Sequence, residues 1–163
     1  MADVHPIRLR GPWQFRVLAR YEPLSGTAQL EYMGEVPPVG RVQMPADWES
    51  HLGHDFRGSV RYVRNFGCPT ALEPHESVYL VLEGVDALGR VVLNGEQLGE
   101  ISLADGPSRF EITGRLQERN ELAVEVELPA YALPEEESQH RGDRIGQAGG
   151  LFGEVRLEIW NGH

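Results

Sequence analysis

Apolar and polar residues alternate along most of the chain. The clearest alternating runs are 13–19, 60–66, 122–128 and 155–159. Side chains of a strand point to opposite faces in turn, so each run predicts a strand with one buried and one solvated face. Such alternation is typical of antiparallel sheets, whereas strands of buried parallel sheets show continuous apolar runs.

Two further segments, 77–84 and 90–93, are richer in apolar residues and predict central strands. Asn94 and Gly95 follow the second segment directly. This pair favours a type I′ turn, in which both central residues have positive φ, and therefore predicts a β-hairpin. We expect the inward faces of the strands to hold Phe15, Val17, Tyr62, Leu80, Leu82, Leu122, Val124, Val155 and Leu157.

Glycine and proline, with 19 and 11 copies, lie mostly between the predicted strands. The pattern predicts an all-β fold, an antiparallel two-sheet β-sandwich, as a single domain over residues 1–163. The stretch 21–38 contains one possible strand, 28–32, and 111–120 has room for one short helical turn. The stretch 129–150 shows no periodicity. We expect it to be a long loop, and such loops in compact domains are usually binding loops or disordered.

Charge and composition exclude some partners. The chain has 25 acidic and 15 basic residues, all of the latter arginine, for a formal net charge of −10. Such a chain repels phosphate backbones, so we expect neither nucleic acid nor an anionic membrane as partner. Cys68 is the one cysteine, which rules out an intrachain disulfide. The first residues lack a secretory signal and no apolar run is long enough to span a bilayer, so a cytoplasmic chain is expected.

Motifs that carry catalysis are missing. The sequence has no nucleophile elbow, no phosphate-binding glycine loop and no His-Glu-x-x-His motif. His51 and His54, flanked by carboxylates, could hold a metal ion, although a hydrated loop anchored by Trp48 is the simpler interpretation. The acidic run 135–137 could bind calcium or could simply be solvated. We therefore expect no catalytic residue and no metal site, with structural calcium as a minor alternative.

Several segments follow one another in an order known from one protein family. They are Leu9 to Phe15, Met44 to Trp48, Gly58 to Phe66, Leu82 to Gly99, Ser108 to Thr113, Asn120 to Val126 and Gly149 to Leu157. Together they resemble the N-terminal sugar-binding domain of glycoside hydrolase family 2, which includes β-galactosidases, β-glucuronidases and β-mannosidases. The resemblance implies a galactose-binding-domain-like jelly roll. The family's catalytic glutamates lie in a barrel domain that follows this one. The chain ends at His163, so we expect no glycosidase activity from it.

The resemblance also implies where a sugar would bind. In the family, two loops of the first domain reach the substrate; here they correspond to 47–57 and 135–150, which open on the same side. Asp55 stands where the family often has asparagine, and Asp143 and Arg144 are the nearest counterparts of an aspartate near the sugar. Gly153 replaces the usual arginine of the closing motif.

From these two loops, the candidate ligand-binding residues are Trp48, His51, Asp55, Asp143, Arg144 and Gln147. We expect Asp55 to accept hydrogen bonds from sugar hydroxyls, Arg144 to donate them, and Trp48 or His51 to pack on the ring. The family counterpart of Trp48 more often anchors the loop in the core. The expected function is a non-catalytic carbohydrate-binding module for a β-linked glycan. The alternative is a structural or protein-interaction scaffold without a sugar site.

Overall fold

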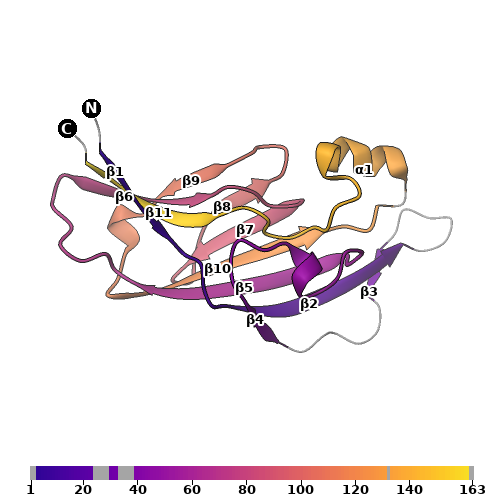
Figure 1. Cartoon of the computed structure of the whole chain (residues 1–163), viewed down its shortest axis with the longest axis horizontal. Helices are drawn as coiled ribbons and strands as arrows, with labels where there is room; N and C mark the ends of the chain where they lie inside the picture. Colours follow the sequence, from indigo (N-terminus) through magenta and orange to yellow (C-terminus); the bar gives the residue numbers. More distant parts are fainter. Residues whose placement is uncertain (1–2, 24–29, 33–38, 132, 162–163) are drawn as a thin grey trace.

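The computed structural model describes residues 3–23, 30–32, 39–131 and 133–161. Within these residues the strands form two antiparallel sheets, which confirms the predicted all-β sandwich (Figure 1). The four-stranded sheet has the order β1 (Val4–Arg8), β11 (Val155–Asn161), β6 (Glu76–Leu82) and β9 (Ser108–Glu111). The larger sheet runs β3 (Leu30–Tyr32), β2 (Trp13–Pro23), β5 (Gly58–Gly67), β10 (Arg119–Leu128), β7 (Leu88–Leu93) and β8 (Glu96–Ser102), and β4 (Gly40–Val42) pairs with β2.

The hydrophobic core lies between the two sheets. All nine residues predicted to face inward are buried, so the alternation in the sequence identified the correct face of each strand. Burying a large aliphatic or aromatic side chain contributes about 1.5–3 kcal/mol, so these residues dominate the stability of the fold. Trp13 adds an anchor near the start of the chain. Its ring is fully buried and its Nε1 donates a hydrogen bond of 2.7 Å to the carbonyl of Leu9.

The predicted hairpin between β7 and β8 is confirmed. Asn94 and Gly95 have φ values of 53° and 84°, and Leu93 pairs with Glu96 across the turn. The short helical turn expected within 111–120 is the 3₁₀ turn η2 (Thr113–Arg115). Of the possible strand 28–32, residues 30–32 form β3, while 28 and 29 lie outside the described residues.

The expectation of an irregular loop over 129–150 is wrong, because this stretch contains the helix α1 (Pro134–Arg141) followed by the 3₁₀ turn η3 (Gly142–Arg144). The helix lacks an apolar stripe, which is why hydrophobic periodicity did not predict it. Its end signals are nevertheless in the sequence. Proline begins the helix, three glutamates follow in the first turn, His140 and Arg141 stand in the last turn, and Gly142 follows with a positive φ.

The sandwich has two distinct ends. Strands β5 and β10 pair along their full length, with Gly58 opposite Leu128 at one end and Gly67 opposite Arg119 at the other. The chain continues from Leu128 toward α1, so we call the first end the α1 end and the second the Gly67 end. Figure 1 shows α1 at the right of the molecule, while β5 extends away from it toward the left. No helix in the described part of the chain is long and apolar enough to cross a membrane.

Candidate functional site

The loops 47–57 and 135–150 lie against each other at the α1 end. The backbone N–H of Trp48 donates to the carbonyl of Gly149 at 2.9 Å, and the Arg57 guanidinium donates to Glu137 of α1 at 3.3 Å. The first loop begins with the 3₁₀ turn η1 (Trp48–Ser50), which Asp47 caps by accepting from the N–H of Glu49 at 3.0 Å. The structure therefore joins the two loops that the sequence analysis singled out.

A buried charge cluster holds the second loop in place. Asp86 is fully buried and accepts hydrogen bonds from Nε and Nη2 of Arg141, at 3.1 Å and 2.6 Å. Arg141 also donates to Glu137 at 3.0 Å and to the carbonyl of Gln147 at 2.6 Å. Burial alone would lower the pKa of Arg141, but the bonds to Asp86 and Glu137 outweigh it and raise that pKa. Arg141 thus stays charged, and its bonds to Asp86 and Glu137 tie α1 to the core.

Beside this cluster, a surface cleft of about 340 Å³ opens between β2 and the loop 47–57. Its polar lining includes the exposed side chains of Arg20, His54 and Asp55, with Tyr21 and Arg57 half-buried. The Tyr21 hydroxyl donates to Glu127 at 2.8 Å. Burial and this carboxylate raise the pKa of Tyr21 to about 12, so the phenol stays protonated at neutral pH. The cleft thus combines a carboxylate, two guanidinium groups and an aromatic wall.

Comparison with known protein families assigns the chain to one of them. The family model of the glycosyl hydrolase 2 galactose-binding domain-like proteins matches residues 51–157. The chain belongs to this family. A comparison with curated protein sequences finds no match.

Solved structures similar to this galactose-binding-like domain include two β-glucuronidases. The FMN-binding enzyme from Facaelibacterium prausnitzii L2-6 is 21% identical, with a TM-score of 0.69, over 98% of this chain and 23% of its own. A β-glucuronidase from glycoside hydrolase family 2 is 19% identical, with a TM-score of 0.69. The match covers 98% of this chain and 18% of that enzyme. A family 2 β-galacturonidase from Eisenbergiella tayi, solved with glycerol, is 19% identical, with a TM-score of 0.64. The match covers 97% of this chain and 24% of that enzyme. At these identities the likeness establishes the fold, and the chain spans about a quarter or less of these proteins.

Two of the predicted ligand residues have other tasks in this galactose-binding-like domain. Trp48 is fully buried, and its ring meets Phe56 edge to face at 4.9 Å between centroids. It cannot pack on a sugar, which corrects that expectation in favour of the core anchor. Arg144 donates to Asp86 at 3.3 Å, to Gln147 Oε1 at 2.7 Å and to the carbonyl of Ala148, and its guanidinium stacks 4.1 Å above the Phe152 ring. Most of its donors are therefore used within the chain.

His51 is half-buried and its ring is largely enclosed. Nε2 lies 2.8 Å from the Tyr62 hydroxyl, Nδ1 lies 2.9 Å from Ser50 Oγ, and the ring centroid is 4.7 Å from that of Phe15. Burial lowers the pKa of His51, against a smaller opposing effect of Asp47. The imidazole is thus neutral at neutral pH, and it bonds the loop to β5.

The remaining predicted residues, Asp55, Asp143 and Gln147, are exposed. Asp55 lines the cleft, whereas Gln147 accepts the bond from Arg144 on the neighbouring loop. Glu137, from the acidic run considered for calcium, is paired with Arg57 and Arg141 instead. Over the described residues, no group of three or more His, Cys, Asp or Glu side chains is placed to hold a metal ion.

Sequence reasoning missed Asp86, Arg141 and the cleft residues Arg20, Tyr21 and Arg57. A signal for Asp86 exists, since it stands among buried residues, where an isolated carboxylate needs a partner. Nothing local could name that partner, because Arg141 lies 55 positions further along the chain.

Proposed function

We propose that the domain is a non-catalytic carbohydrate-binding module whose sugar site is the cleft at the α1 end. The cleft of about 340 Å³ beside Asp55 carries this proposal, because a carboxylate, two guanidinium groups and an aromatic ring all line it. Sugar sites use such sets of carboxylates, guanidinium groups and aromatic surfaces, with only a few polar groups in each. The family to which the chain belongs is described as galactose-binding domain-like, which supports the same class of ligand.

Four cleft residues have definite roles in this proposal. The exposed Asp55 carboxylate accepts hydrogen bonds from sugar hydroxyls, and the exposed Arg20 donates them. Arg57 is held by its bonds to the carbonyl of Phe56 and to Glu137, so its free N–H groups keep a fixed direction. The Tyr21 ring supplies apolar surface. Asp143 and Gln147, exposed on the adjacent loop, are further contacts for a longer glycan.

A role as part of a larger glycoside hydrolase belongs to the same proposal. The similar solved structures include β-glucuronidases and a β-galacturonidase, and this domain corresponds to a minor share of each. Within such an enzyme the cleft would orient a β-linked glycan, and the chemistry would take place on another domain. The domain on its own is expected to show no turnover of β-galactosides, β-glucuronides or β-mannosides.

A scaffold role without a sugar site is the second candidate. It is favoured by Arg144, whose donors mostly bond within the chain, and by two exposed apolar residues, one directly before α1 and one directly after η3. Leu133 is 58% exposed and Ile145 is 45% exposed, so both are available to a partner protein.

Calorimetric titration of the purified chain with methyl β-galactoside, methyl β-glucuronide and methyl β-mannoside tests the sugar site. We expect one of these glycosides to bind, and Asp55→Ala to weaken its binding about tenfold or more by removing a charge-assisted hydrogen bond. Glu73→Ala is the matched control, since it removes an exposed carboxylate in the turn between β5 and β6. If no glycoside binds, or if both variants bind like the parent chain, the sugar site is wrong and the scaffold role stands.

A further inference from the structure

A second cavity lies at the Gly67 end, away from the proposed sugar cleft. It has a volume of about 830 Å³ and opens between β1 of the four-stranded sheet and β5 and β10 of the larger sheet. We call it the Arg64 cavity. Its volume falls within the range of small-molecule sites.

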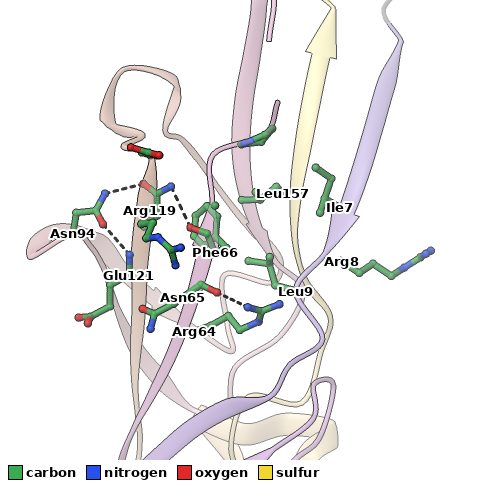
Figure 2. Close-up of a pocket in the computed structure, with 14 residues that line it drawn as sticks. Ile7, Arg8, Leu9, Arg64, Asn65, Phe66, Asn94, Arg119, Glu121 and Leu157 are labelled. Atoms are coloured by element: carbon green, nitrogen blue, oxygen red, sulfur yellow. Dashed lines mark hydrogen bonds between the residues drawn. The ribbon is translucent and has the colours of Figure 1, made fainter. Parts of the chain in front are cut away.

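The floor of the Arg64 cavity is apolar. Leu9 and Leu157 are buried, whereas Ile7 and Phe66 are only half-buried although they belong to core-facing registers. Figure 2 shows Ile7, Leu9 and Leu157 gathered on one side of the cavity, with Phe66 facing them from β5. The core is therefore unfilled at this end, and its apolar surface is open to a ligand.

One arginine shares the inward face with these residues. Arg64 lies between Tyr62 and Phe66 in the register of β5, so it points into the sandwich, where an apolar residue would be expected. One N–H of its guanidinium donates to the carbonyl of Asn65. Its Nε is buried and has no hydrogen-bond partner among the described residues. A buried N–H of a charged group is normally paired, so this atom stands ready for an acceptor.

No carboxylate of the described chain pairs with Arg64. Two nearby arginines differ in this respect. Arg8 is paired with Glu154 at 2.8 Å and points away from the cavity in Figure 2, and Arg61, on the outer face, is paired with Glu121 at 3.8 Å. Arg119 also lines the cavity. The Glu121 side chain also points away from Arg64 in that view. A guanidinium left without a counter-ion beside apolar surface favours an anion that also carries apolar surface.

Side-chain hydrogen bonds link the elements that form another wall of the cavity. The buried Asn120 accepts from Asn94 Nδ2 at 3.0 Å and donates to the carbonyl of Phe66 at 3.4 Å, and Asn94 Oδ1 accepts from the N–H of Glu121 at 2.8 Å. These bonds fix the turn, β10 and β5 relative to one another. A ligand would therefore meet a preformed wall, which lowers the entropic cost of binding.

We propose that the Arg64 cavity binds a small organic carboxylate with an apolar body. The carboxylate accepts hydrogen bonds from Arg64, including one from the unpaired Nε, and the apolar body covers Phe66 and Leu157. This site is separate from the sugar cleft, because the two lie at opposite ends of β5.

Calorimetric titration with benzoate and cyclohexanecarboxylate tests this site, with benzyl alcohol and acetate as probes that lack the charge or the apolar body. We expect one molecule of benzoate or cyclohexanecarboxylate to bind per chain at millimolar concentration, and the two control probes to bind more weakly. Arg64→Gln should weaken binding about tenfold or more, and Arg64→Lys less, because lysine keeps the charge.

Arg61→Gln is the matched control on the same strand, where the side chain lies on the outer face and should not affect binding. Ile7→Phe, on the edge strand β1, fills the cavity while leaving Arg64 in place, and it should also weaken binding. The proposal is overturned if neither carboxylate binds the parent chain, if Arg64→Gln and Arg61→Gln bind equally well, or if benzyl alcohol binds as tightly as benzoate. Thermal unfolding of each variant without ligand separates loss of the site from loss of the fold.

Discussion

Each end of the sandwich carries an inward-pointing arginine, but the two arginines differ in how far their guanidinium groups are hydrogen-bonded within the chain. At the α1 end, Arg141 is fully buried and bonds to Asp86, Glu137 and the carbonyl of Gln147. At the Gly67 end, Arg64 has a buried Nε that no described residue bonds, and it lies beside open apolar surface. The contrast indicates two different roles for guanidinium groups in this fold. Guanidinium groups with complete hydrogen bonding build the protein, and those with unused donors are available to a ligand.

The largest effect expected from this contrast is the loss of the Asp86–Arg141 pair. Arg141→Met leaves the Asp86 carboxylate buried without its main partner, which should lower the free energy of unfolding by about 3–5 kcal/mol. Urea denaturation measures the loss. Arg57→Met is the control, because this half-buried arginine bonds Glu137 near the surface and should cost about 1 kcal/mol or less. Equal losses in the two variants would show that the buried pair does not hold this end together.

The second effect concerns the packing of the loop 135–150 on Trp48. Gly150 has a φ of +114°, and a Cβ there would lie 2.7 Å from Trp48 Cδ1. Gly146 has a φ of +85° but meets nothing within 4 Å. Gly146→Ala should therefore lose only about 1 kcal/mol through its backbone conformation. Gly150→Ala should lose roughly 1–3 kcal/mol more from overpacking. Thermal unfolding compares them, and a Gly150→Ala variant as stable as Gly146→Ala would contradict this packing.

A smaller effect is the pH dependence that His51 brings to the α1 end. Its pKa in the folded chain is lowered by burial from the ordinary 6.5, so the unfolded chain binds the proton more tightly. Stability from this group is fully present above pH 6.5 and is lost as the pH falls from there toward the lowered pKa. His51→Gln should flatten that part of the stability curve, measured by urea unfolding at several pH values.

His54→Gln is the control for that experiment, because His54 is exposed on the same loop. A slope that survives in the His51→Gln variant would assign the pH dependence to other groups.

The smallest effect on stability is expected at the sugar cleft itself. Asp55 is exposed, so Asp55→Ala should change the free energy of unfolding by no more than about 0.5 kcal/mol while it weakens glycoside binding. Urea unfolding of this variant checks the point. A large loss of stability would mean that Asp55 serves the loop and not a ligand.

The sequence predicted those features that depend on neighbouring residues. Alternation along β5 and β10 determines which side chains face the core, and Asn94-Gly95 determines the turn between β7 and β8. Both are local properties of the backbone. The helix α1 escaped prediction since its contact with the core runs through Arg141 and not through an apolar stripe. The sequence left open whether Trp48 packs on a sugar or anchors its loop in the core, because its burial depends on Gly149 and Gly150, about a hundred positions away.

Within the alternating run 60–66, Arg64 stands in the same register as the buried Tyr62 of β5. A charged residue at such a position is a signal in its own right, since a buried guanidinium needs either an internal partner or an external one. The sequence shows the misplaced charge, and only the structure shows that no carboxylate of the described residues meets it.

The sugar site at the α1 end is tested most directly by NMR. The isotope-labelled chain is titrated with the best-binding methyl glycoside, and the amide chemical shifts are followed. We predict that the shifts change at the α1 end, around Arg20, Tyr21 and residues 52–57, and stay unchanged around Arg64 and Phe66. Shift changes centred on Arg64 and Phe66, or no changes at any glycoside concentration that can be reached, would contradict a sugar site at the α1 end.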